Sequence, residues 1–342
     1  MPNLKITLPS LFLIIFGLLV LNSIAHFLFP TYFLYVLLAL LTYFFISKVD
    51  FGVISLFSRH LYIMSIVLLI ITLVIGQVTR GAIRWIPIGK LTIQTSEIAR
   101  PLLLVFFANF LTQKELNLKI LLKALLLLVL PFILILVQPS LGVALLTIIG
   151  FLGVFLAASF DKKYLFLTLL GGLALIPLFW FVLAPYQKTR ILTFLNPNID
   201  PKGAGYNAIQ SLISVGSGKL TGRGLGRGVQ TQLSFLPERQ TDFIFASIAE
   251  EMGFVGAALL LLVTFYLLNS VLNLAKEANS PAGRAFISGL FLTYFAQVFV
   301  HVGMNMGLFP ITGVPYPLVS AGGSSLLATM MGLGIAVGMR KK

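Results

Sequence analysis

One acidic residue at the end of a long polar segment is the strongest candidate for chemistry in this sequence. Asp242 lies in Leu-Pro-Glu-Arg-Gln-Thr-Asp-Phe-Ile-Phe, residues 236–245, where the polar segment meets a hydrophobic run. Acids are scarce, with 10 Asp and Glu residues against 24 Lys and Arg. An ionisable residue at a membrane edge commonly marks a functional site. We take Asp242 as the candidate catalytic acid or base; the alternative is that Thr241 and Asp242 only cap a helix start.

A glycine-rich basic segment, residues 216–228, precedes Asp242. Its glycines allow close backbone approach, and its N–H groups and cations can meet phosphate oxygens. The spacing is not that of a nucleotide-binding P-loop. A flexible linker explains the same composition equally well.

A second polar segment, residues 76–100, carries Arg84, Trp85, Glu97 and Arg100. Trp85 suits a membrane interface. Thr95 or Ser96 could cap the helix that follows, and Glu97 would then share a helix face with Arg100. From these residues alone, capping plus an ion pair is favoured over chemistry.

The composition is that of a membrane protein. Hydrophobic residues make up 58% of the 342 residues and charged residues 10%, with a mean hydropathy of +1.02. A water-soluble fold could not cover its surface with so few charges. The absence of cysteine excludes disulfides and thiolate-metal sites, and three scattered His residues argue against a His-based metal cluster.

The apolar runs predict an all-α, polytopic membrane protein with ten transmembrane helices in a single domain, residues 1–342. Each run is near the ~20 residues that cross a bilayer. The expected spans are 9–29, 31–47, 61–78, 98–113, 119–137, 141–159, 163–184, 243–274, 284–304 and 315–338. A large loop, about 185–242, separates the seventh from the eighth. Within this loop, residues 207–215 predict a short amphipathic surface helix.

Three further features concern the spans near the C-terminus. The eighth span is overlong, so its first turns could lie at the interface or re-enter the membrane. Small residues at 246, 249, 253 and 257 form a packing stripe near the azimuth of Asp242. Glu250 and Glu251 are interpreted as structural or as interface anchors. Pro315 and Pro317 flank Tyr316, which predicts non-helical backbone lining a cavity or buried in protein.

The distribution of Lys and Arg predicts the orientation of the spans. More than half of the 24 basic residues lie in short loops and tails on the side of both termini, which we place in the cytoplasm. The other basic residues gather in the two outward segments, 76–100 and 185–242. Attraction to anionic lipid headgroups explains that charge, and so does an anionic substrate arriving at the outer face.

Several motifs resemble those of the RodA/FtsW (SEDS) family of bacterial cell-wall polymerases, in order and over nearly the whole chain. They are Gly81-Ala82-Ile83-Arg84-Trp85-Ile86, Gln94-Thr95-Ser96-Glu97, Gly205-Tyr206, Phe235 to Phe245, Glu250-Glu251-Met252-Gly253, Pro310 to Pro317 and Gly322-Gly323-Ser324-Ser325. The sequences of residues 228–232 and 235–239 are similar to those of the RodA branch.

The resemblance implies an inverting peptidoglycan glycosyltransferase that polymerises lipid II outside the cytoplasmic membrane for cell elongation and rod shape. Its essential acid falls on Asp242, and a class B penicillin-binding protein is the implied partner. No nucleic acid or organic cofactor is expected, whereas a divalent cation (Mg or Mn) could assist at the diphosphate. The expected substrate-binding residues are Arg84, Glu97, Arg100, Lys219, Arg223, Arg227, Arg239 and Ser324.

Two residues depart from the family pattern, and two other functions stay open. Thr95 replaces a usual proline, and Ser140 replaces a usual acid in the turn between the fifth and sixth spans. A flippase for lipid-linked precursor would also suit ten helices with a polar cleft, but it predicts polar residues on both sides of the membrane. An FtsW-like division polymerase is the other alternative.

Overall fold

The computed structural model describes residues 3–79, 82–89, 91–113, 117–158 and 162–339. Gly81 of the first motif and the basic residues 340–342 lie outside them. The helices are α1 (Leu4–Ile24), α2 (Thr31–Ile46), α3 (Phe51–Leu56), α4 (Ser58–Ile75), α5 (Thr95–Thr112), α6 (Leu118–Val137), α7 (Leu141–Ala157), α8 (Lys162–Val182), α9 (Pro185–Leu195), α10 (Ala204–Ser217), α11 (Val229–Gln232), α12 (Ile244–Glu277), α13 (Pro281–Asn305) and α14 (Gly323–Gly338).

Long apolar helices form a bundle that carries large apolar side chains on its outside. Among the described residues, α1, α4, α6, α12 and α13 are long and apolar enough to cross a membrane, and α2, α7 and α14 are shorter apolar helices. On α6, Leu122, Leu126 and Ile133 are all at least half exposed. Exposing so much apolar surface to water would cost free energy, so we interpret this surface as facing lipid.

A helix overlaps each of the ten expected segments, with shifted ends. The first helix begins at Leu4 rather than at residue 9. The last begins at Gly323 rather than at 315, because residues 310–322 run without regular structure, as the flanking prolines of Tyr316 predicted. Tyr316 is 1% exposed and pairs with the Thr264 hydroxyl at 2.8 Å, so this non-helical stretch is buried in protein.

Segment 76–100 contains a three-stranded antiparallel sheet that the sequence analysis did not predict. The order is β1 (Gln77–Thr79), β2 (Ala82–Ile88), β3 (Leu91–Gln94), with Trp85 paired to both Gln77 and Gln94. Its β-branched residues favour strands, but Gly and Pro in the segment obscured the pattern. The sheet extends directly into α5.

The expected cap of α5 is wrong. Gln94 is the N-cap residue and makes no side-chain cap, while Thr95 already has helical geometry. The Thr95 hydroxyl instead pairs with that of Thr72 at 2.5 Å. Glu97 does lie in the first turn, as expected.

The overlong α12 consists of two helices joined at a kink. Gly253 has φ +67° and ψ −164°, which a residue with a Cβ rarely adopts. The small residues Ala246, Ala249 and Ala257 are buried, at most 8% exposed, but the break at Gly253 and the position of Asp242 before α12 mean that they do not form one continuous helical stripe with Asp242. The kink therefore separates a short first part of α12 from the long apolar part.

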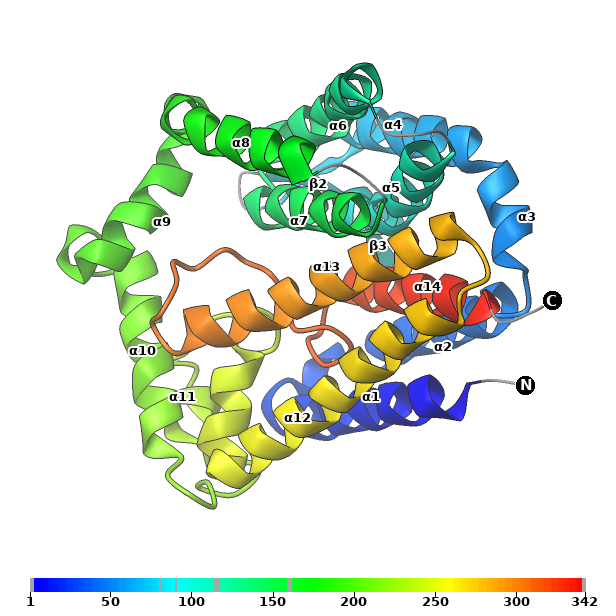
Figure 1. Cartoon of the computed structure of the whole chain (residues 1–342). Coiled ribbons are helices and arrows are strands. Elements are labelled where there is room, and N and C mark those ends of the chain that lie inside the picture. The colour runs from blue at the N-terminus through cyan, green and yellow to red at the C-terminus, as the bar shows by residue number, and fades with distance from the viewer. Residues whose placement is uncertain (1–2, 80–81, 90, 114–116, 159–161, 340–342) are drawn as a thin grey trace.

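The segment between α8 and α12 covers one end of the bundle. In Figure 1, α9 and α10 run across the direction of α12 and α13, at the end opposite the first turn of α1 and the last turn of α14. The predicted helix at 207–215 is present as α10, and a short 3₁₀ turn (Pro197–Ile199) joins it to α9. Ile209, Leu212 and Ile213 of α10 are more than 40% exposed.

Candidate active site

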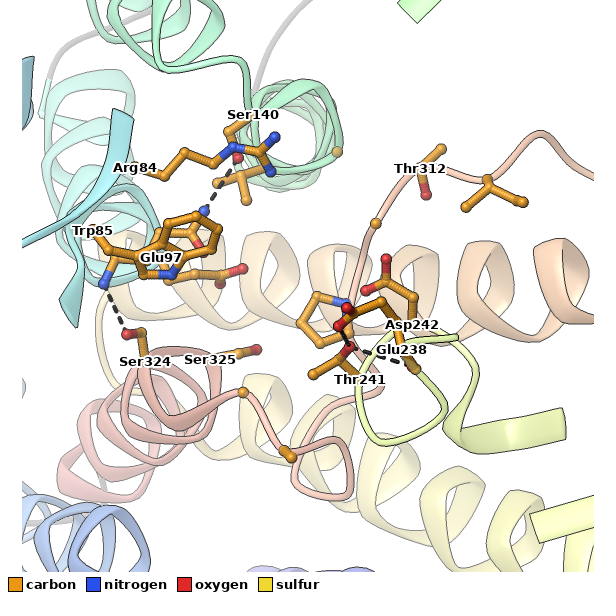
Figure 2. A pocket seen from close by; sticks show the side chains of 18 of the residues that line it. Arg84, Trp85, Glu97, Ser140, Glu238, Thr241, Asp242, Thr312, Ser324 and Ser325 are labelled. Atoms are coloured by element: carbon orange, nitrogen blue, oxygen red, sulfur yellow. Dashed lines mark hydrogen bonds between the residues drawn. The ribbon is translucent and has the colours of Figure 1, made fainter. Parts of the chain in front are cut away.

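A cavity of about 720 Å³ opens where the β-sheet, the start of α7, α9 and the segment before α12 meet. Figure 2 shows Arg84, Trp85 and Glu97 on one side of this space and Glu238, Thr241 and Asp242 on the other. The lining combines charged side chains with apolar ones such as Leu141 and Ile191. Such a cavity suits a ligand that is partly ionic and partly apolar.

Asp242 lies in this cavity, in a turn before α12. Phe243 is the N-cap residue of α12, and the first turn of this fully described helix holds no acid. The alternative that Asp242 belongs to the first helical turn is therefore wrong. A Cβ placed on Gly313 would lie 3.6 Å from Asp242 Oδ2 and 3.7 Å from Arg190 Nη1, so the carboxylate and this guanidinium approach the same point.

Two guanidinium groups, Arg84 of β2 and Arg190 of α9, line the cavity with Tyr186. Burial lowers the pKa of Arg84, and Arg190 lowers it further, while Tyr186 and Asp242 act in the opposite direction. Burial raises the pKa of Tyr186, which the two Arg side chains partly offset. Since Arg stays protonated, the cavity holds two cations close enough to repel each other. An anionic group bound between them would relieve that repulsion.

Glu97 and Arg100 form a buried ion pair on α5. Their side chains are each 2% exposed, with Arg100 Nη2 2.8 Å from Glu97 Oε2. Arg100 Nη2 also donates to Gln297 Oε1 at 3.3 Å, and Gln297 donates to Pro315 O at 2.8 Å. The expected ion pair is confirmed. Glu97 lines the cavity, whereas Arg100 is not among the described lining residues.

Ser324 lies at the cavity wall and joins α14 to the sheet. Its Oγ accepts from Gln94 N at 2.8 Å and donates to Thr92 O at 3.3 Å. Tyr35 of α2 also binds the backbone of Thr92, with its hydroxyl accepting from N at 2.6 Å and donating to O at 2.8 Å. β3 is therefore held from both α2 and α14.

The chain matches one protein-family model over almost its whole length. The family model of FtsW, RodA and SpoVE cell cycle proteins matches residues 7–342. The chain belongs to this family. It is 41% identical over 283 residues to the peptidoglycan glycosyltransferase MrdB of Escherichia coli K12, covering 82% of this chain and 76% of MrdB. It is 35% identical over 306 residues to the stage V sporulation protein E of Bacillus subtilis 168, covering 87% and 82%.

Two solved structures share the fold of this chain. A chain from a peptidoglycan synthase complex, described as coordinating polymerization and crosslinking, has a TM-score of 0.85 and 29% identity over 98% of this chain and 97% of its own. The rod shape determining protein RodA of Thermus thermophilus has a TM-score of 0.75 and 27% identity, over 99% and 97%. The chain is thus a polytopic helical membrane protein of the RodA type.

The two departures from the family pattern both lie beside Gln94. The Gln94 side-chain amide donates to Ser96 Oγ and to Ser140 Oγ, each at 3.2 Å. Ser140 therefore takes part in a neutral hydrogen-bond network at the cavity wall. Thr95 is the first residue of α5, a position that also accepts proline.

The glycine-rich segment lies against α12, and its described cations are not among the cavity-lining residues. Arg223 N donates to Glu250 O and Gly224 N to Glu251 O, each at 2.9 Å. A Cβ on Gly222 would clash with Glu251 O, so this glycine allows close packing against the protein's own helix. Substrate binding by Lys219, Arg223 and Arg227 stays a prediction.

Arg239 also points elsewhere than the cavity. Its Nε donates to Ile24 O at 3.1 Å and its Nη1 to Ser234 Oγ at 3.0 Å. A cation at the last carbonyl groups of α1 stabilises that helix end. Arg239 therefore ties α1 to the segment that leads to Asp242, and its expected substrate contact stays a prediction.

The two acids of the Glu250-Glu251 motif have the structural role that we expected. Glu250 accepts from Gln230 N at 2.9 Å and from Thr231 N at 3.0 Å. Glu251 accepts from Ser23 Oγ at 2.6 Å and from Gln232 Nε2 at 2.8 Å. Both side chains are at most 1% exposed. They hold the start of α11 and the end of α1 against α12.

Replacing Glu250 by Gln should destabilise the protein without removing a cavity residue. One of the two backbone N–H groups would lose its acceptor, which costs about 1–3 kcal/mol for a buried donor. Thermal unfolding in detergent measures the change, with the exposed Glu277→Gln as the matched control. Equal melting temperatures for the two variants would contradict this role.

Arg190 and Tyr186 are the site residues that we did not select from the sequence. Arg190 was one of many outward cations, and nothing in its neighbours separated it from Lys188. The sequence offered only the spacing of these residues as a clue. Residues 185–195 form α9, and the helical spacing of Tyr186, Gln187 and Arg190 brings all three to the cavity. That arrangement depends on where α9 packs.

Proposed function

We propose that this protein is a peptidoglycan glycosyltransferase that polymerises lipid II at the outer face of the cytoplasmic membrane. The observation that carries the proposal is one cavity that holds the Asp242 carboxylate together with Arg84 and Arg190. The relative MrdB is named for the same activity. Production of glycan chains from purified lipid II by the purified protein tests it, and no polymer would refute it.

The chemistry divides between the acid and the cations. An acceptor sugar hydroxyl attacks the anomeric carbon, a new glycosidic C–O bond forms, and the bond to the lipid diphosphate breaks. Asp242 takes the hydroxyl proton as general base. The diphosphate leaves with the bonding electron pair and needs charge neutralisation more than a proton, which Arg84 and Arg190 supply. A single displacement inverts the anomeric configuration.

Among the described residues, no three His, Cys, Asp or Glu side chains are arranged to hold an ion. We therefore derive no step through a metal. The expectation that Mg or Mn assists at the diphosphate is tested by polymerisation with and without a chelator.

The proposed topology has ten membrane crossings in a single domain, 1–342, with both termini in the cytoplasm and segment 185–242 outside. The apolar helices of the bundle and the crosswise α9 and α10 at one end support it (Figure 1). Accessibility labelling of a cysteine placed in the outward segment tests the orientation. Labelling from the cytoplasm would refute both topology and mechanism.

We further propose cell elongation as the role and a class B penicillin-binding protein as the partner. The 41% identity to MrdB exceeds the 38% to an FtsW of Escherichia coli, which supports the RodA branch over a division polymerase. The solved synthase complex, described as coordinating polymerization and crosslinking, supports a crosslinking partner. Co-purification with the transpeptidases of the native host tests the pairing.

A flippase is the alternative that the site disfavours. The polar residues of this protein that line the cavity gather beside the segment that precedes α12. A cavity at one end of the bundle suits chemistry at one face of the membrane. Vesicles with labelled lipid II separate the two functions. Movement across the bilayer without polymer would favour the flippase.

Replacing Arg190 by Gln should lower kcat/KM for lipid II about 100-fold, because one charge that stabilises the departing diphosphate is lost. The matched control is Lys188→Gln on the same helix, which removes a cation that is not a cavity-lining residue. Initial rates of polymerisation measure both. Equal losses in the two variants would show that only net charge matters.

A further inference from the structure

The turn that carries Asp242 is held at four successive carbonyl groups. Ser247 Oγ donates to Arg239 O at 3.1 Å, and Ala321 N donates to Gln240 O at 2.8 Å. Ser320 Oγ donates to Thr241 O at 2.8 Å, and Asn305 Nδ2 donates to Asp242 O at 3.0 Å. These donors come from α12, from the non-helical stretch 310–322 and from the end of α13. The turn is therefore set by tertiary contacts.

Asn305 contributes more to this arrangement than the single bond to Asp242. It is the last residue of α13 and is 0% exposed. Its Oδ1 accepts from Ala246 N at 3.0 Å, and its Nδ2 also donates to His301 O at 2.7 Å. Since Phe243 provides no side-chain cap for α12, Asn305 supplies the missing acceptor for the first turn from another helix.

We propose that Asn305 is a positioning residue for the reaction, fixing the backbone of Asp242 and the start of α12 at the same time. The proposal rests on the proposed glycosyltransferase function. Asn305 acts through the backbone, since its amide bonds Asp242 O rather than the carboxylate. A base must be placed within a fraction of an ångström of the proton that it takes, and a misplacement of about 1 Å can cost ~100-fold in rate.

The Ser211 hydroxyl links the hydrogen bonds of Asn305 to α10, in segment 185–242. It is 0% exposed and donates to Asn305 O at 2.9 Å, which anchors α10 at the end of α13. Leu236, Phe243, Ala246 and Ile311 form a small apolar cluster beside it. Asn305 thus lies where α10, α12 and α13 meet, so a change in its amide should move the turn, whereas Arg84 comes from β2 on the other side of the cavity (Figure 2).

The test compares Asn305→Asp and Ser320→Ala with Thr293→Val in the purified full-length protein. Asp keeps the shape and the acceptor for Ala246 N–H, but it has at most one O–H donor in place of the two N–H donors that bond Asp242 O and His301 O. Thr293 is a buried α13 residue whose hydroxyl donates to Gly289 O of its own helix at 2.7 Å. Thr293→Val therefore controls for loss of a buried hydrogen bond in α13.

We expect kcat for polymerisation to fall about 100-fold in Asn305→Asp and about 10-fold in Ser320→Ala, with KM for lipid II within twofold of wild type. Thr293→Val should keep kcat. A kcat near wild type in both test variants, or a rise in KM alone, would overturn the proposal. Ser320→Ala decides the question if Asn305→Asp does not fold.

Hydrogen exchange provides a readout that does not need activity. Amides of residues 239–246 should exchange faster in Asn305→Asp than in Thr293→Val. Unchanged exchange there would overturn the positioning role even if the wild type polymerises lipid II. A wild type that makes no polymer would instead refute the proposed function, while the exchange data still decide whether Asn305 holds the turn.

Discussion

Replacing Asp242 by Asn should abolish glycan polymerisation to within the detection limit, with a loss of about 10²–10⁴-fold in rate. Loss of a positioned general base removes rate enhancement of that order. The substitution keeps the size of the side chain, and its backbone carbonyl still accepts from Asn305. The folded protein should therefore remain, and only the proton acceptor is lost. Purified lipid II and gel separation of the glycan products measure the effect.

Glu238→Gln is the matched control for this prediction. Glu238 also lines the cavity, and its carboxylate accepts from the Thr241 hydroxyl at 3.2 Å. If any acid in the cavity served, both variants would lose activity equally. Normal polymer from correctly inserted Asp242→Asn protein would refute the assignment of the base.

Breaking the buried Glu97–Arg100 ion pair should have the largest effect on stability. Glu97→Gln leaves the Arg100 guanidinium, which is 2% exposed, without its carboxylate. Loss of one partner of a buried pair costs about 3–5 kcal/mol because the other charge stays buried and uncompensated. Thermal unfolding in detergent should show a large decrease in melting temperature.

The double substitution Glu97→Leu with Arg100→Met separates this cause from simple loss of contacts. Replacing both charges by apolar residues of similar size removes the uncompensated charge, so stability should exceed that of Glu97→Gln. Activity should stay low, because Glu97 lines the cavity. A double variant less stable than Glu97→Gln would show that the ion pair is not the source of the effect.

From the amino-acid sequence alone we could predict the helical membrane class, the approximate positions of the helices and Asp242 as the candidate catalytic residue. These follow from local properties. Runs near 20 apolar residues can satisfy their backbone polar groups in lipid only as helices or closed barrels, and acids are rare enough here for one at a segment boundary to stand out. The Glu97–Arg100 pair was also predictable, since residues three apart share a helix face.

The packing of elements distant in the chain establishes which cations lie near Asp242. Spacing could not separate Arg190 from Arg223, Arg227 or Arg239, because all lie in one long polar segment. Packing places α9 at the cavity, lays the glycine-rich segment along α12, and turns Arg239 to the end of α1. The small sheet and the bonds of Asn305 likewise join residues far apart in the chain. Such contacts depend on how elements meet in space, which local periodicity does not encode.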